Sequence, residues 1–133
     1  MKSSGFVRGF IHKNILMSQQ IADLFAEKNQ MILKGQLAEA REKFYADKVR
    51  ILDFDGTVVN SKKEFMETRE EFLGSIAKVR EISLLNTGVG ENVTFAEFIF
   101  DFEMKDGNSM RWHEIIESKW KDGLVVEEQY FKG

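Results

Sequence analysis

Two carboxylates, Asp53 and Glu114, have sequence neighbours that suit acid–base chemistry. Asp53 lies on the same face of an extended segment as Val49, while Arg50 on the other face marks that side as solvent-facing, so we expect Asp53 to end a buried row. Burial favours the uncharged form of a carboxylate and makes it a stronger base, which suits a general base. The alternative is that Asp53 only caps the turn that follows it.

Glu114 lies in a run with strand periodicity at 110–120, where alternate residues point to opposite faces. The more apolar face carries Trp112, Glu114, Ile116, Ser118 and Trp120. We expect this face to point inward, which places the Glu114 carboxylate among aromatic side chains. If Asp53 lies nearby, the two acids should titrate as a coupled pair. The alternative places Glu114 at a rim, bonded to a backbone amide or a lysine. His113 would replace it only if a β-bulge reversed the register.

Phenylalanine is the unusual component of the composition, with 12 residues. Those at alternate positions of run 93–105 share one face, and two more lie on helical faces. The residues expected to line an apolar pocket are Phe25, Phe72, Phe98, Phe100 and Phe102, together with Trp112 and Ile116 from the neighbouring strand. Such a pocket suits a flat or hydrophobic small molecule. The same stripe would also serve as ordinary packed core.

The elements that must position these residues change in type along the chain. Apolar residues recur at helical spacing first and alternate as in strands afterwards. The pattern predicts helices over about 18–34, 36–46 and 62–79, an extended segment near 49–54, and strands over 82–87, 93–105, 110–120 and 124–131. Asp-Gly pairs separate the last strands, as in hairpins. Helices followed by an antiparallel meander predict an α+β protein with the helices packed on one sheet face.

Composition excludes several classes of function. The chain has 133 residues, 19 basic and 22 acidic side chains, and neither cysteine nor proline. A net charge of −3 argues against a nucleic-acid groove or an anionic-membrane footprint. Without cysteine there is no disulfide or thiolate metal site, and the two histidines are too far apart to form a zinc site alone. We expect a cytoplasmic protein without a metal or cofactor.

Residues 1–17 contain basic but no acidic side chains, and their apolar stretches are too short for a signal-peptide core or a membrane span. We interpret them as a leader or extension, and residues 18–133 as a single domain. The alternative is that apolar residues of this segment dock on the domain or on a second chain.

The string ILDFDGTVV at 51–59 resembles the D-x-D-G-T motif of haloacid dehalogenase-like phosphatases. That resemblance implies Asp53 as nucleophile and Asp55 as general acid, with Mg²⁺ between carboxylates. The family requires a doubly wound parallel sheet, whereas the residues after the third helix alternate as antiparallel strands. The phosphatase hypothesis is therefore the remote alternative.

A second resemblance covers nearly all of residues 18–133. The segments that carry it are FYAD at 44–47, VRI at 49–51, D-x-D-G at 53–56 and WKDGLVVEE at 120–128, in this order around a third helix. Together they resemble the SnoaL-like branch of the nuclear transport factor 2-like superfamily, which includes ketosteroid isomerase, limonene epoxide hydrolase and scytalone dehydratase. The resemblance implies a cystatin-like cone of curved antiparallel sheet around helices, a hydrophobic pocket, and a homodimer formed through the outer sheet face.

The resemblance also bears on the site. It places Asp53 where isomerase-like members carry their base, but it places Ile116 where their second, protonated aspartate lies, so steroid isomerisation itself is not expected. We therefore predict a cofactor-free isomerase, cyclase, dehydratase or hydrolase that acts on a hydrophobic small molecule. In it Asp53 moves a proton and Glu114 or Trp112 orients the substrate. The competing hypothesis is a noncatalytic ligand-binding or dimerisation module of the same fold.

Overall fold

The computed structural model describes residues 19–133. The leader predicted for residues 1–17 lies outside them. The helices are 19–33, α2 (Leu37–Phe44) and α3 (Lys62–Gly74), and the strands are β1 (Tyr45–Leu52), β2 (Val58–Val59), β3 (Ile76–Val89), β4 (Val93–Met104), β5 (Ser109–Lys121) and β6 (Leu124–Lys132). No helix among these residues is long and apolar enough to cross a membrane.

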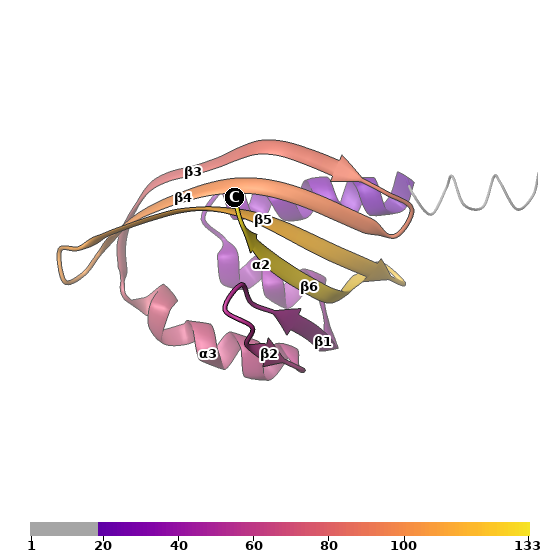
Figure 1. The fold of residues 1–133 in the computed structure, drawn as a ribbon, viewed down its shortest axis with the longest axis horizontal. Helices are drawn as coiled ribbons and strands as arrows, with labels where there is room; N and C mark the ends of the chain where they lie inside the picture. Colours follow the sequence, from indigo (N-terminus) through magenta and orange to yellow (C-terminus); the bar gives the residue numbers. More distant parts are fainter. Residues whose placement is uncertain (1–18) are drawn as a thin grey trace, which may run out of the picture.

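The strands form one sheet in the order β2-β1-β6-β5-β4-β3, curved around the helices as Figure 1 shows. Strands β3 to β6 form the predicted antiparallel meander, and β1 joins it in parallel to β6. Register shifts along β3 locally bend and twist the long β3–β4 ribbon. The predicted α+β cone, with helices packed in a curved and mostly antiparallel sheet, is confirmed.

Local sequence signals account for several element ends. Gly35 has φ +78° and ends helix 19–33, where the Gln36 amide donates to the Met31 carbonyl, as in a C-terminal glycine cap. Ser61 caps α3, because its hydroxyl accepts a hydrogen bond from the Glu64 amide at 3.0 Å. The hairpin between β5 and β6 turns through Asp122 and Gly123, both with positive φ.

The prediction that the third helix extends to residue 79 was wrong. Helix α3 ends at Gly74, and Ile76 begins β3, which pairs with β4 almost to its end. The apolar spacing of Ile76 and Val79 is compatible with either structure over so short a stretch. Pairing with the long β4 decides the outcome, because tertiary context overrides local propensity.

The concave side of the sheet holds the core. Phe98 and Phe102 are fully buried, and Phe65 of α3 is 1% exposed. Phe44 of α2 packs edge-on against Trp120 at 6.1 Å between ring centroids. The alternation predicted for run 93–105 is confirmed, since its phenylalanines at even positions point inward. Large side chains therefore fill most of the cone.

Candidate functional site

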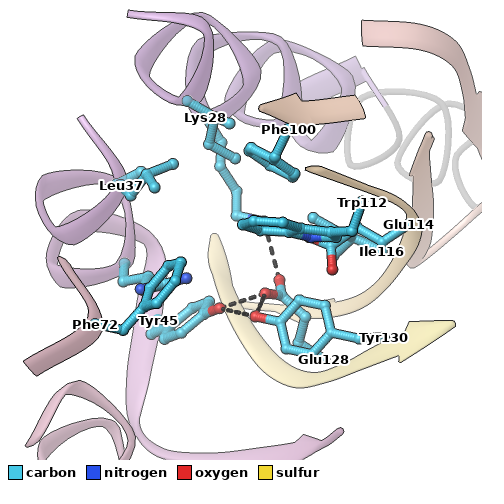
Figure 2. A pocket seen from close by; sticks show the side chains of 13 residues that line it. Lys28, Leu37, Tyr45, Phe72, Phe100, Trp112, Glu114, Ile116, Glu128 and Tyr130 are labelled. Atoms are coloured by element: carbon cyan, nitrogen blue, oxygen red, sulfur yellow. Dashed lines mark hydrogen bonds and ion pairs between the residues drawn. The ribbon is translucent and has the colours of Figure 1, made fainter. Parts of the chain in front are cut away.

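A cavity of about 50 Å³ remains between the helices and the concave side of the sheet. Its wall combines apolar side chains with four acidic or basic groups and two phenols, and Figure 2 shows the labelled members. The lining residues are Lys28, Ile32, Leu37, Ala40, Arg41, Tyr45, Phe72, Phe100, Trp112, Glu114, Ile116, Glu128 and Tyr130. The volume is enough for a few water molecules or a polar head group, and it is well below that of a drug-sized ligand pocket.

A buried carboxylate, Glu128 of β6, is the centre of a hydrogen-bond network on the cavity wall (Figure 2). Its Oε2 accepts from the Lys28 ammonium at 2.9 Å and from the Ser118 hydroxyl at 2.8 Å. Its Oε1 accepts from the Tyr130 hydroxyl at 2.7 Å and from the Tyr45 hydroxyl. Glu128 is 1% exposed, and each of its carboxylate oxygens accepts two hydrogen bonds.

The network fixes the protonation states of its members. Burial alone would raise the pKa of Glu128, but the Lys28 ammonium and the hydrogen bonds from the tyrosines outweigh it, and the pKa lies below its ordinary value. Burial, with the Glu128 charge second, raises the pKa of Tyr45 and of Tyr130 well above the usual range for a phenol. At neutral pH the wall therefore carries a charged carboxylate and two neutral phenols.

Glu114 of β5 is the titratable group of the cavity. Burial raises its pKa to about 7, and the negative charges of Glu128 and Asp53 act in the same direction. A hydrogen bond from Trp112 and the positive charge of Arg41 oppose this rise without cancelling it. Near neutral pH this carboxyl exchanges between its acid and base forms, which a group that both removes and returns a proton requires.

The raised pKa of Glu114 predicts a pH-dependent stability. Between pH 4.5 and 7 the folded protein retains this proton longer than the unfolded chain does, so raising the pH favours unfolding. Glu114→Gln removes the effect. We expect the free energy of unfolding of the wild type, relative to this variant, to fall by about 3 kcal/mol from pH 4 to pH 8. Urea unfolding at both pH values measures it, and an unchanged difference would contradict the burial of this carboxyl.

The structure brings five of the predicted site residues to the cavity. They are Phe72, Phe100, Trp112, Glu114 and Ile116. The other three predicted pocket phenylalanines, Phe25, Phe98 and Phe102, are buried in the core but do not line this cavity. These three phenylalanines are ordinary packed core, which was the alternative to lining a pocket.

Asp53 does not line the cavity. It follows β1, and its side chain is 17% exposed and ion-paired with Arg69 of α3. Its carboxylate also accepts from the Phe54 amide at 2.9 Å, and the Gly56 amide donates to its carbonyl at 3.0 Å, which is the turn arrangement considered as the alternative. The role of Asp53 as a general base stays a prediction.

Asp55 is exposed and accepts a hydrogen bond from the Thr57 amide at 2.9 Å. The sheet that follows is an antiparallel meander, so the described residues lack the doubly wound parallel sheet that the phosphatase hypothesis requires. Within residues 19–133, no group of three or more His, Cys, Asp or Glu is arranged to hold a metal ion.

Sequence reasoning missed Arg41, Tyr45, Glu128 and Tyr130. One signal was present for Lys28, which occupies the apolar face of its helix in the sequence pattern and is 3% exposed in the structure. A lysine at such a position requires a buried anionic partner. The sequence does not identify that partner, since Glu128 is 100 residues away.

A groove of about 660 Å³ lies beside the cavity. It is formed by residues of α2 and α3 with Asp47 of β1, and its lining mixes acids, bases and the apolar side chains of Ala38, Met66 and Leu73. Arg41 is the residue that the linings of the groove and of the cavity share.

Comparison of the structure with solved structures decides the fold group. A protein of Mesorhizobium loti assigned as a SnoaL-like polyketide cyclase superimposes with a TM-score of 0.73 over 84% of this chain and 97% of that one, at 22% sequence identity. The chain has the SnoaL-like, NTF2-like fold. An NTF2-like protein of unknown function from Burkholderia pseudomallei gives a TM-score of 0.69 at 11% identity, covering 86% of this chain and 91% of that one.

A third SnoaL-fold neighbour, TerC, was co-crystallised with polyporic acid. It has a TM-score of 0.67 and 7% identity, covering 86% of this chain and 92% of that one. No family model and no curated protein matches the sequence. At these identities the comparisons establish the fold, and the predicted resemblance to SnoaL-like and ketosteroid isomerase-like proteins is confirmed at that level.

Proposed function

We propose that this SnoaL-fold protein is a cofactor-free acid–base enzyme acting on a hydrophobic carbonyl compound, with Glu114 as the group that moves the proton. The observation that carries the proposal is the position of Glu114, a half-buried residue whose carboxyl lies on a cavity wall and has a pKa of about 7. Isomerisation, cyclisation and dehydration of carbonyl compounds all begin with removal of a proton next to the carbonyl. That step requires a base whose pKa lies near the working pH.

The other wall residues have complementary tasks in this proposal. Trp112 and Phe100 stack at 5.1 Å between ring centroids and supply a flat apolar surface. The phenols of Tyr45 and Tyr130 are both held by Glu128, and their oxygens lie 2.9 Å apart. These hydrogen bonds hold the two phenols in place on the cavity wall. They also keep Glu128 ionised, and its negative charge acts on Glu114. Asp53 remains the alternative base, as the sequence predicts.

The size of the cavity sets where the substrate lies. About 50 Å³ holds the reacting carbonyl group but not a hydrophobic body, so the body occupies the adjoining groove of about 660 Å³. Small-molecule binding is supported by TerC, a neighbour of the same fold, which was co-crystallised with polyporic acid.

The experiment that tests the proposal uses 2-tetralone, a hydrophobic ketone with exchangeable protons next to its carbonyl. We expect the protein to accelerate incorporation of deuterium from D₂O at these carbons, with saturation as the ketone concentration rises. The readout is proton NMR of the ketone. A rate equal to that of buffer with bovine serum albumin would contradict the proposal.

A noncatalytic ligand-binding or dimerisation module is the second candidate. It is favoured by the tight filling of the cone, where Phe98, Phe100 and Phe102 are at most 4% exposed. On the outer sheet face, Phe95 and Phe131 are 41% and 39% exposed, which supports the predicted homodimer. Light scattering at a mass twice that of the 15.4 kDa chain would establish it. Cytoplasmic location stays a prediction.

A further inference from the structure

The guanidinium of Arg41 is the polar group that the proposed acid–base step leaves unused. Its Nη1 is buried and has no hydrogen-bond partner within the described part of the chain. A buried charged donor without an acceptor is costly, and proteins nearly always satisfy such groups. Because Arg41 lines the cavity, its unpartnered donor points to an acceptor that the ligand brings.

The acids nearest to Arg41 do not supply that acceptor. Glu128 already accepts from four donors, two on each oxygen, and its charge is compensated by Lys28. Glu114 is only partly ionised near neutral pH, since its pKa is about 7. The cavity wall therefore carries an excess of positive charge, located on Arg41.

The side chain of Arg41 is also held in place. Its guanidinium carbon lies 5.1 Å from the centre of the Phe65 ring, and that of Arg69 lies 4.7 Å from the same ring. Arg69 is neutralised by Asp53, whereas no carboxylate of the described residues lies within ion-pair distance of Arg41. A planar guanidinium held over an aromatic ring presents donors that match a carboxylate.

We propose that Arg41 binds a carboxylate of the ligand, so that the natural ligand is a hydrophobic organic acid whose body lies in the groove between α2 and α3. Arg41 lines both the groove and the cavity, so a ligand whose body lies in the groove can bring its carboxylate to this guanidinium. The groove's Met66 and Leu73 provide apolar contact for the body. The inference rests on the cavity being a ligand site, as the proposed function holds, and it adds the charge of the ligand.

The test compares two probes of the same shape, 2-naphthoate and the neutral 2-naphthamide, by isothermal titration calorimetry at pH 7. One charge-assisted hydrogen bond predicts that the wild type binds 2-naphthoate about tenfold or more tightly than 2-naphthamide. Arg41→Gln is expected to reduce this ratio to about one. Arg41→Lys keeps the positive charge but not the planar set of donors that a guanidinium offers to a carboxylate, so it is expected to retain part of the preference for 2-naphthoate.

Arg50→Gln is the matched control, because it removes the same charge from a residue that pairs with Glu127 and lines neither the cavity nor the groove. It is expected to keep the preference for 2-naphthoate within about twofold of the wild-type ratio. Urea unfolding of each variant shows whether it is folded. Equal affinities of the wild type for the two probes, no binding of either, or a preference that survives Arg41→Gln would overturn the inference.

Failure of the inference is distinguishable from failure of the proposed function. Glu114→Gln removes the proposed base and is expected to retain the preference for 2-naphthoate while losing deuterium exchange into 2-tetralone. A wild-type protein that prefers 2-naphthoate but catalyses no exchange would support the carboxylate site and contradict the enzyme. Catalysed deuterium exchange without a preference for 2-naphthoate would support the enzyme and contradict the carboxylate site.

Discussion

Replacing Glu128 with glutamine is expected to lower the free energy of unfolding by about 3–5 kcal/mol. The substitution keeps the size of the side chain but removes its charge, which leaves the buried Lys28 ammonium without a counter-ion. It also places an amide donor where four donors already meet one carboxylate, so at least one of them loses its acceptor. Urea unfolding at pH 7 measures the change.

Glu127, the preceding residue, provides the matched control for this substitution. It is paired with Arg50 and Lys119 at 3.8 Å on the half-exposed side of the same strand. Glu127→Gln is expected to change the free energy of unfolding by less than about 1 kcal/mol, since exposed ion pairs contribute little. The double variant Lys28→Met with Glu128→Gln removes both buried charges and leaves an amide oxygen for the hydroxyl donors, so it should recover the part of the loss that comes from the uncompensated Lys28 ammonium. Similar losses for the Glu127 and Glu128 variants would show that the buried network is not a stability determinant.

Glu114→Gln is expected to reduce protein-catalysed deuterium exchange into 2-tetralone by about 10²–10⁴-fold, the range for loss of a general base. Glutamine has nearly the shape of glutamate but does not accept a proton in this pH range. The rate of exchange at saturating ketone, followed by proton NMR, is the measurement. Because burial holds the pKa of Glu114 near 7, the wild-type rate should rise through that pH and then level off.

Two further variants locate the base. Glu117 lies on the same strand as Glu114 but on the opposite face, where it pairs with Gln129 of β6, and Glu117→Gln should leave the rate within about twofold. Asp53→Asn separates the two candidate bases. A loss as large as that for Glu114→Gln, in a folded Asp53 variant, would place the base at Asp53 as the sequence predicts and contradict its assignment to Glu114.

The period of alternation explains why part of the site follows from the sequence. Side chains alternate between the two faces of a strand, so one residue assigned to the interior fixes which of the others also point inward. This rule assigned Phe100 on β4, and Trp112 and Glu114 on β5, to the interior. Their cross-strand pairing, Phe100 with Trp112 and Phe98 with Glu114, needed only the antiparallel hairpin signal between them. The inner faces of β4 and β5 were therefore predictable.

The rest of the site depends on contacts that local patterns do not encode. Tyr45 reaches Glu128 because β1 pairs in parallel with β6, across 83 residues of sequence. Arg41 lies on a short helix whose orientation is set by packing against α3 and the sheet. The end of α3 shows the same limit, because Ile76 is equally compatible with a helix and with the strand that it begins. In each case a long-range partner decides the structure.

The pKa of the Glu114 carboxyl is the most direct test of the account. Carbon-13 NMR titration of protein labelled at glutamate side-chain carboxyls, with Glu114→Gln to assign the resonance, measures it without any ligand. We expect a midpoint of about 7. We also expect a lower midpoint in folded Glu128→Gln protein, because the Glu128 charge helps to raise the pKa of Glu114. A wild-type midpoint near the ordinary 4.5 would contradict a buried acid–base group and, with it, the proposed function.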